Sequence, residues 1–169
     1  MTVNSSGESP LRIEHLAVSD LFEQLRTETS SGERPEVALE WQLGEGLPAL
    51  ETDRGKLAMV LRNLVDNALK FTHRGRVTVA AELADDAVVF TVTDSGIGIG
   101  EHDLPVIFEL FRQVEPAHTR RHGGVGLGLY MVKRLLMQLH GDIEVDSTVG
   151  EGSRFLVRIP TRLGNAELS

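Results

Sequence analysis

The sequence predicts one α+β domain, a two-layer α/β sandwich with a mixed, mostly antiparallel sheet and helices on one face. Three observations support this fold class. The expected elements run helix, strand, helix, strand, strand, helix, strand, strand, which contains too many hairpins for a doubly wound parallel fold. The connections within the strand pairs are too short to hold a helix. Each long helix also carries a wide apolar face that a sheet or another helix has to cover.

The elements follow from hydrophobic periodicity and from capping and turn residues. Asp20 with Glu23 forms a capping pair, Asp53 is expected to cap the first long helix, and Gly141 to end the second. The hairpin connection A-D-D-A joins the two central strands. In chain order we expect a helix at 20–29, a strand at 37–43, a short extended stretch at 49–51, a helix at 57–72, strands at 77–83 and 88–94, a short helix at 103–109, a helix at 126–140, and strands at 143–147 and 153–160.

The helix at 57–72 carries two faces with different chemistry. Its apolar face predicts burial against the sheet and consists of Leu57, Val60, Leu61, Leu64, Val65 and Ala68. Asn63, Asn67 and Lys70 follow the spacing i, i+4, i+7 and form a second, polar stripe. Amide oxygens suit a hard cation and an ammonium suits a phosphate, although a solvated polar face has the same pattern.

Composition limits the function classes. The net charge of −8 argues against non-specific binding to nucleic acid or to an anionic membrane. The absence of cysteine excludes disulfides and thiolate metal sites, and together with the lack of a signal peptide it suggests a cytoplasmic location. We expect a disordered lead-in at 1–10, one domain at 11–162 and a tail at 163–169.

Two glycine-rich segments are candidate ligand loops. The first, D-S-G-I-G-I-G at 94–100, leaves a strand, so Asp94 can accept a hydrogen bond from an exocyclic amine. Gly96 and Gly98 allow the backbone to approach a flat ring closely. The second, G-G-V-G-L-G-L at 123–129, opens a helix and forms an anion site, but it is neither a Walker loop nor a dinucleotide fingerprint.

Taken together, these segments resemble the ATP-binding catalytic domain of sensor histidine kinases, in the superfamily shared with gyrase-type ATPases and the large heat-shock chaperones. The resemblance is carried by N-L-V-D-N-A-L-K-F-T, D-S-G-I-G-I, I-F-E-L-F-R-Q, T-R-R-H-G-G-V-G-L-G-L and G-E-G-S-R-F. It implies a Bergerat-type fold with a mobile lid over the polar stretch 112–124, with ATP and Mg²⁺ as ligands.

The resemblance also implies roles for individual residues. Asn67 ligates Mg²⁺ with Asn63 close by, and Lys70 contacts phosphate. The residues implied in ATP binding are Asn63, Asn67, Lys70, Phe71, Asp94, Gly96, Gly98, Ile99, Arg120, Gly124, Gly126, Leu127, Gly128 and Ser153. Of these, Asn63, Lys70 and Arg120 are the expected catalytic set, and Phe108 and Phe111 are expected to anchor the lid and touch a partner helix.

The side chain at position 63 favours a kinase over an ATPase. In the ATPase branches the corresponding residue is a glutamate that activates water, whereas an amide cannot act as a general base. We therefore expect transfer of the γ-phosphoryl to a histidine on a separate helical dimerisation domain, with a response regulator downstream and a monomeric catalytic domain. None of the six histidines lies in the H-E-x-x-T-P setting of an acceptor. An anti-sigma-factor-type serine kinase and a non-catalytic nucleotide-sensing or scaffold domain are the alternatives.

Overall fold

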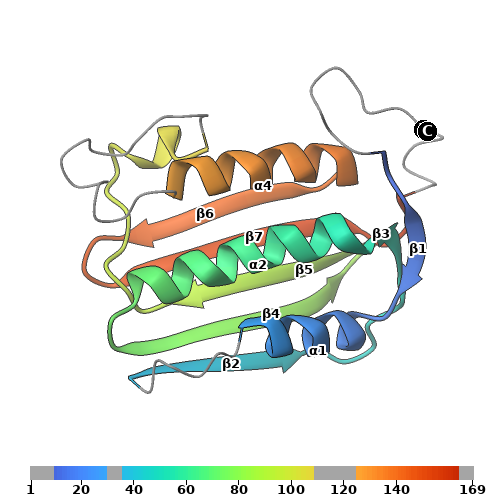
Figure 1. Cartoon of the computed structure of the whole chain (residues 1–169), viewed down its shortest axis with the longest axis horizontal. Helices are drawn as coiled ribbons and strands as arrows, with labels where there is room; N and C mark the ends of the chain where they lie inside the picture. The colour runs from blue at the N-terminus through green and yellow to red at the C-terminus, as the bar shows by residue number, and fades with distance from the viewer. Residues whose placement is uncertain (1–9, 30–35, 109–124, 164–169) are drawn as a thin grey trace.

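A computed structural model of the chain describes residues 10–29, 36–108 and 125–163. Figure 1 shows a sheet with helices packed on one face, as the sequence predicts. The strands follow the order β2-β4-β5-β7-β6, and a separate two-stranded sheet pairs β1 with β3. The elements are β1 (Ile13–Leu16), α1 (Val18–Thr29), β2 (Val37–Leu43), β3 (Leu50–Asp53), α2 (Arg54–Phe71), β4 (Gly75–Ala84), β5 (Ala87–Asp94), the 3₁₀ helix η1 (Leu104–Val106), α4 (Val125–Leu139), β6 (Asp142–Thr148) and β7 (Gly152–Pro160).

The five-stranded sheet is mixed but mostly antiparallel. Only β2 and β4 run parallel, and the chain passes through α2 between them, because parallel neighbours need a crossover. The β4–β5 pair is the predicted hairpin, and β7 adds to β5 antiparallel in a register that pairs Asp94 with Ser153. The polar ends of these strands therefore lie side by side at one end of the sheet.

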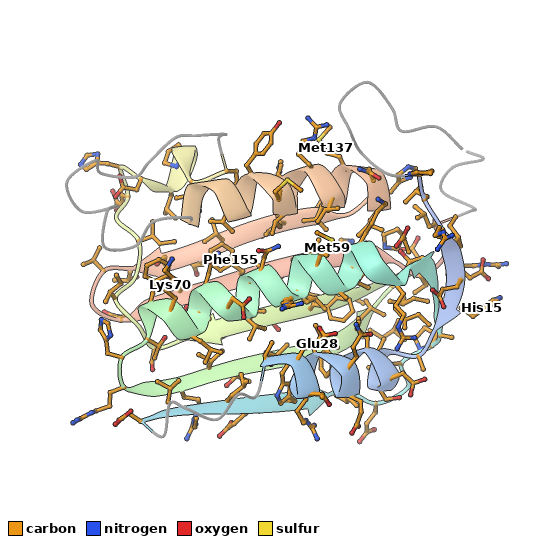
Figure 2. The ribbon with its side chains drawn as sticks, in the orientation of Figure 1. His15, Glu28, Met59, Lys70, Met137 and Phe155 are labelled. Carbon is orange, nitrogen blue, oxygen red and sulfur yellow. The ribbon has the colours of Figure 1, made fainter. Side chains whose placement is uncertain are left out.

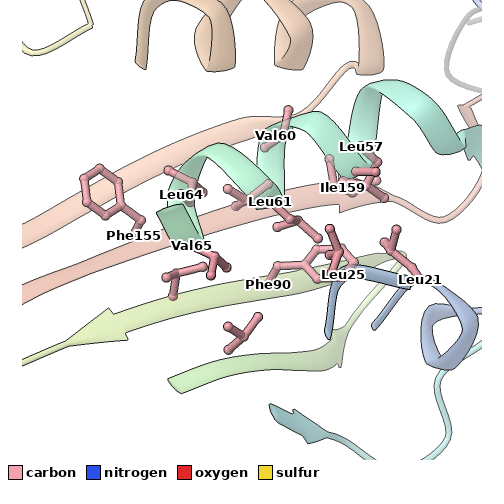
Figure 3. Packing of buried hydrophobic residues seen from close by; sticks show 14 of the residues in the cluster. Leu21, Leu25, Leu57, Val60, Leu61, Leu64, Val65, Phe90, Phe155 and Ile159 are labelled. Atoms are coloured by element: carbon pink, nitrogen blue, oxygen red, sulfur yellow. The ribbon is translucent and has the colours of Figure 1, made fainter. Parts of the chain in front are cut away.

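The core lies between the sheet and the helices. All six residues of the predicted apolar face of α2 are buried, and Figure 3 shows several of them packed over Phe90 and Ile159. Phe22 of α1 extends the core to β2, where its ring contacts Trp41 edge-on with centroids 5.3 Å apart. Helix α4 is the third helix on this face, next to α2 (Figure 1).

The two predicted helix starts had different outcomes. The structure begins α1 at Val18, so Asp20 lies inside the first turn and the predicted capping pair of Asp20 with Glu23 was wrong. Helix α2 begins at Arg54, directly after the predicted Asp53 cap and three residues before the first residue of its apolar stripe, Leu57. The Asp53 cap itself is confirmed: its side chain accepts a hydrogen bond from the Lys56 N–H at 3.0 Å and another from the Arg12 N–H at 2.8 Å.

The end of α4 also differs from the prediction. The left-handed residue is His140, with φ of 59°, while the Gly141 N–H donates to the Leu136 carbonyl at 2.8 Å. Position 141 instead needs a glycine because it has no room for a side chain: a Cβ there would lie 2.7 Å from the Arg158 carbonyl oxygen. The predicted helix at 103–109 is only the single 3₁₀ turn η1 within the described residues.

The N-terminal and C-terminal segments of the described chain meet beside β3. The sequence assigned no element to β1, which is short and has only one buried residue, Leu16. On the other side of β3, the Glu51 N–H donates to the Thr161 carbonyl at 2.8 Å. Leu163 is fully buried, so the core extends one residue past the domain end expected from the sequence.

Candidate nucleotide-binding site

Three segments that are distant in the sequence meet at one end of the sheet. The loop after β5 donates from the Ile97 N–H to the Phe71 carbonyl at the end of α2, at 3.2 Å. The Ile97 carbonyl accepts from the Gly150 N–H of the β6–β7 hairpin at 2.8 Å. Figure 1 places the first turn of α4 at this same end of the molecule. The end of α2, the first glycine-rich loop and the hairpin thus form one unit.

Asp94 lies at the centre of this unit. It is 9% exposed, and its Oδ1 accepts from the Gly96 N–H at 2.8 Å and from the Ser153 N–H at 3.3 Å. Burial raises the pKa of this carboxyl above its usual value, and the two backbone hydrogen bonds partly oppose that rise. Both described bonds fall on Oδ1, so Oδ2 is available to accept a hydrogen bond from a ligand.

The first glycine-rich loop owes its glycines to protein packing. A Cβ at Gly96 would overlap the Phe71 carbonyl oxygen, and one at Gly98 would overlap the Thr148 carbonyl oxygen. Gly98 also has φ of 79°, which side chains rarely adopt. The sequence attributed these glycines to the approach of a flat ring, and that role stays a prediction.

The polar stripe of α2 leads toward the same end. The Asn63 amide donates back to the Met59 carbonyl of its own helix at 2.8 Å. The Nδ2 atom of Asn67 is buried and has no hydrogen-bond partner. Lys70 is exposed near the C-terminal end of α2, as Figure 2 shows, and its Nζ lies 5.8 Å from the centroid of the Phe71 ring. The structure therefore brings the end of this stripe close to the loop that follows Asp94.

The second glycine-rich loop is only partly described. Gly126, Leu127 and Gly128 lie in the first turn of α4, where free backbone amides point out of the helix end. Arg120, Gly124 and Phe111, like the predicted lid, lie outside the described residues. Phe108 follows η1, is half-buried against the core, and has the Lys133 Nζ 5.8 Å from its ring centroid.

Sequence reasoning missed one polar residue of the site, Ser147 on β6. Its Oγ accepts from the Ile99 N–H at 2.7 Å and lies 2.7 Å from the Ser153 Oγ. The available signal was the alternation of Ile143, Val145 and Ser147, which turns all three side chains toward the helices. That alternation gave no hint of the contact with the β5 loop, which depends on tertiary structure.

The sequence profile of one family matches residues 52–163, more than half of the chain, and its description is "Histidine kinase-, DNA gyrase B-, and HSP90-like ATPase". The chain therefore belongs to this family of ATPases. No helix within the described residues is long and apolar enough to cross a bilayer.

The relatives that this chain resembles are sensor kinases. It is 42% identical to the autoinducer 2 sensor kinase/phosphatase LuxQ of Vibrio cholerae, over 68% of this chain and 14% of LuxQ. It is 35% identical to the circadian input-output histidine kinase CikA of Synechococcus elongatus, over 92% of this chain and 21% of CikA. Within the family, the chain is thus an ATP-binding catalytic domain of the sensor histidine kinase type, and it spans a small part of these relatives.

Solved structures support the same fold. Full-length ShkA in complex with AMPPNP matches with a TM-score of 0.78 at 29% identity, over 90% of this chain and 32% of ShkA. The catalytic domain of the histidine kinase ThkA matches with a TM-score of 0.76 at 22% identity, over 90% of this chain and 98% of that domain. The ThkA match covers nearly the whole domain, so the predicted α/β sandwich is confirmed.

Proposed function

We propose that this chain binds Mg·ATP and transfers the γ-phosphoryl group to a histidine on a separate helical dimerisation domain, from which a response regulator then receives it. The observation that carries this proposal is the amide at position 63. Its Nδ2 is committed to a helix carbonyl, and an amide has no basic pair with which to activate water. The site therefore binds ATP without a general base for hydrolysis at this position.

The adenine end of the proposed site consists of Asp94, the loop after it and Ser153. The free Oδ2 of Asp94 would accept a hydrogen bond from the exocyclic amine, and burial of the carboxylate strengthens such a bond. The Phe71 carbonyl accepts from the Ile97 N–H of this loop at 3.2 Å, and we propose that the Phe71 ring stacks near the adenine. The relative ShkA, of which this chain covers 32%, was solved in complex with AMPPNP, which supports an adenine nucleotide as the ligand.

The triphosphate end consists of Lys70, the amides at the start of α4 and Asn67. Mg²⁺ typically keeps several waters and binds few protein groups together with substrate phosphates. No cluster of three or more histidine, cysteine or acidic side chains occurs in the described ranges, so a metal cage of that kind is not part of them. The side-chain oxygen of Asn67 would be the single protein ligand of this ion, and its Nδ2, buried and in no described hydrogen bond, would remain a donor. The ion would neutralise charge on the transferring group.

Phosphoryl transfer from labelled ATP to an added dimerisation domain tests this function. We expect an acid-labile phosphoprotein and ATP hydrolysis well below about 1 s⁻¹, the low end of kinase turnover. An acid-stable product would instead support the serine kinase, and binding without transfer would support a nucleotide-sensing domain.

A pair of variants on α2 provides the control. Asn67→Ala should abolish Mg²⁺-dependent binding of ATP. Asp66→Asn should leave it unchanged, because that side chain is 58% exposed and its nearest described ion-pair partner is Arg62, at 4.0 Å. Equal loss in both variants would contradict the assignment of Asn67.

A further inference from the structure

Asp94, Ser153 and Ser147 form a row across three neighbouring strands. The register pairs Asp94 of β5 with Ser153 of β7, and Ser153 in turn with Ser147 of β6. Directly opposite residues place their side chains on the same face of a sheet, here the face that carries the helices. Ser153 is 8% exposed, so its hydroxyl lies in a largely dry environment beside the Asp94 carboxylate.

The hydrogen bonds around Ser147 determine where the hydroxyl protons lie. Its Oγ contacts the Ile99 N–H at 2.7 Å, the Gly152 carbonyl at 2.9 Å and the Ser153 Oγ at 2.7 Å. The Ile99 N–H can only donate and the Gly152 carbonyl can only accept. Ser147 has a single proton, so donating it to Gly152 leaves Ser147 to accept from the Ser153 hydroxyl.

This arrangement makes all three hydrogen bonds at once. In the alternative, Ser147 donates to Ser153, and the hydrogen bond from Ser147 to the Gly152 carbonyl, at 2.9 Å, is lost. Gly152 cannot move away easily, because its backbone is packed so closely against the Asp94 carbonyl that a Cβ would overlap it. The favoured arrangement therefore directs the Ser153 proton away from Asp94 and toward Ser147.

We propose that Ser147 is a positioning residue for base selectivity: by holding the Ser153 proton, it makes the Asp94–Ser153 edge accept hydrogen bonds only. Such an edge matches a purine with a 6-amino group, which only donates there. The oxygen of a 6-keto purine is an acceptor, so it could form no hydrogen bond with Asp94 or Ser153 at this edge. This inference rests on the proposed binding of ATP and concerns how the same site rejects keto purines.

The test compares ATP with inosine triphosphate, which replaces the 6-amino group by a keto oxygen and protonates N1. Dissociation constants of both, with Mg²⁺, are measured by calorimetry for wild type, Ser147→Ala and Ser147→Thr. One hydrogen bond corresponds to roughly three- to tenfold in affinity. In Ser147→Ala the freed Ser153 hydroxyl can rotate and donate to the keto oxygen, so the preference for ATP should fall by about that factor. Ser147→Thr keeps a hydroxyl and should keep the preference.

Variants at position 153 separate positioning from a general structural effect. In a Ser153→Ala background, adding Ser147→Ala should leave the ratio of the two dissociation constants unchanged, because Ser147 acts through Ser153. An unchanged ratio in Ser147→Ala, with both nucleotides weakened equally, would overturn the inference and leave ATP binding intact. Ser147→Cys, which keeps the volume and weakens the acceptor, is the replacement if the alanine variant does not fold. A folded wild type that binds neither nucleotide would overturn the proposed function as well.

Discussion

Replacing Asp94 by asparagine removes one charge from the centre of the site and changes little else. The amide oxygen can still accept from the Gly96 and Ser153 N–H groups that bind Oδ1 in the wild type at 2.8 and 3.3 Å. The Nδ2 atom then takes the place of Oδ2 and presents a donor to the exocyclic amine. The fold should therefore persist while the recognition of adenine is lost.

The size of the loss follows from the hydrogen bond that disappears. A hydrogen bond to a charged group contributes about 1.5–3 kcal/mol, and each 1.4 kcal/mol corresponds to about tenfold in affinity. Asp94→Asn should thus weaken ATP binding by roughly ten- to a hundredfold or more. The new Nδ2 and the exocyclic amine are both donors, so their unfavourable contact adds to the loss.

Calorimetric titration with Mg·ATP measures this change, and thermal unfolding followed by fluorescence of the single tryptophan, Trp41, checks the fold. Asp86→Asn is a matched control, because it makes the same change at the opposite end of β5, in a side chain that is 94% exposed. An Asp94→Asn protein that is folded and binds ATP within threefold of wild type would refute the reasoning. So would a loss of binding of equal size in Asp86→Asn.

Three further predictions concern pH, the glycine loop and the core. Burial raises the pKa of Asp94 in the folded state, so protonation of Asp94 stabilises the fold at low pH, and this contribution is lost as pH rises through that pKa. Urea unfolding at a series of pH values should show this decrease in the free energy of unfolding in wild type and not in Asp94→Asn. ATP affinity should fall as pH drops through the same raised pKa, because the protonated acid no longer offers its charge. Gly96→Ala should abolish ATP binding, since its Cβ overlaps the Phe71 carbonyl, whereas Gly100→Ala should bind normally because its nearest neighbour lies 3.5 Å away; calorimetry on both compares them, and equal affinities would be the contrary result. Leu61→Ala should lower the free energy of unfolding by about 2–5 kcal/mol in urea titrations, as Leu61 is 0% exposed, and a loss below about 1 kcal/mol would contradict its place in the core.

Much of the site could be anticipated because its parts are local in sequence. The i, i+4, i+7 spacing of Asn63, Asn67 and Lys70 fixes a helix stripe whatever surrounds it. The Asp53 cap and the glycine-rich loop after Asp94 are likewise encoded within a few residues. Such patterns are predictable because helix periodicity, capping and backbone freedom depend on near neighbours.

Helix ends and short elements were harder to predict. The apolar stripe of α2 begins at Leu57, three residues after the helix itself begins at Arg54. Periodicity did not predict β1 (Ile13–Leu16), because a four-residue strand with one buried side chain has no alternation to detect. The left-handed conformation at His140 rather than at Gly141 depends on the packing of Gly141 against β7.

By itself, the sequence determined the two-layer class, the hairpin, the helix stripe and the acid at a strand end. Only the tertiary structure decided the strand order β2-β4-β5-β7-β6 and, with it, the row of Asp94, Ser153 and Ser147. The physical reason is that strand pairing joins residues 59 positions apart, as between Asp94 and Ser153, through contacts that no local pattern encodes. Proton placement at Ser153 depends on that pairing, and so does the base selectivity inferred from it.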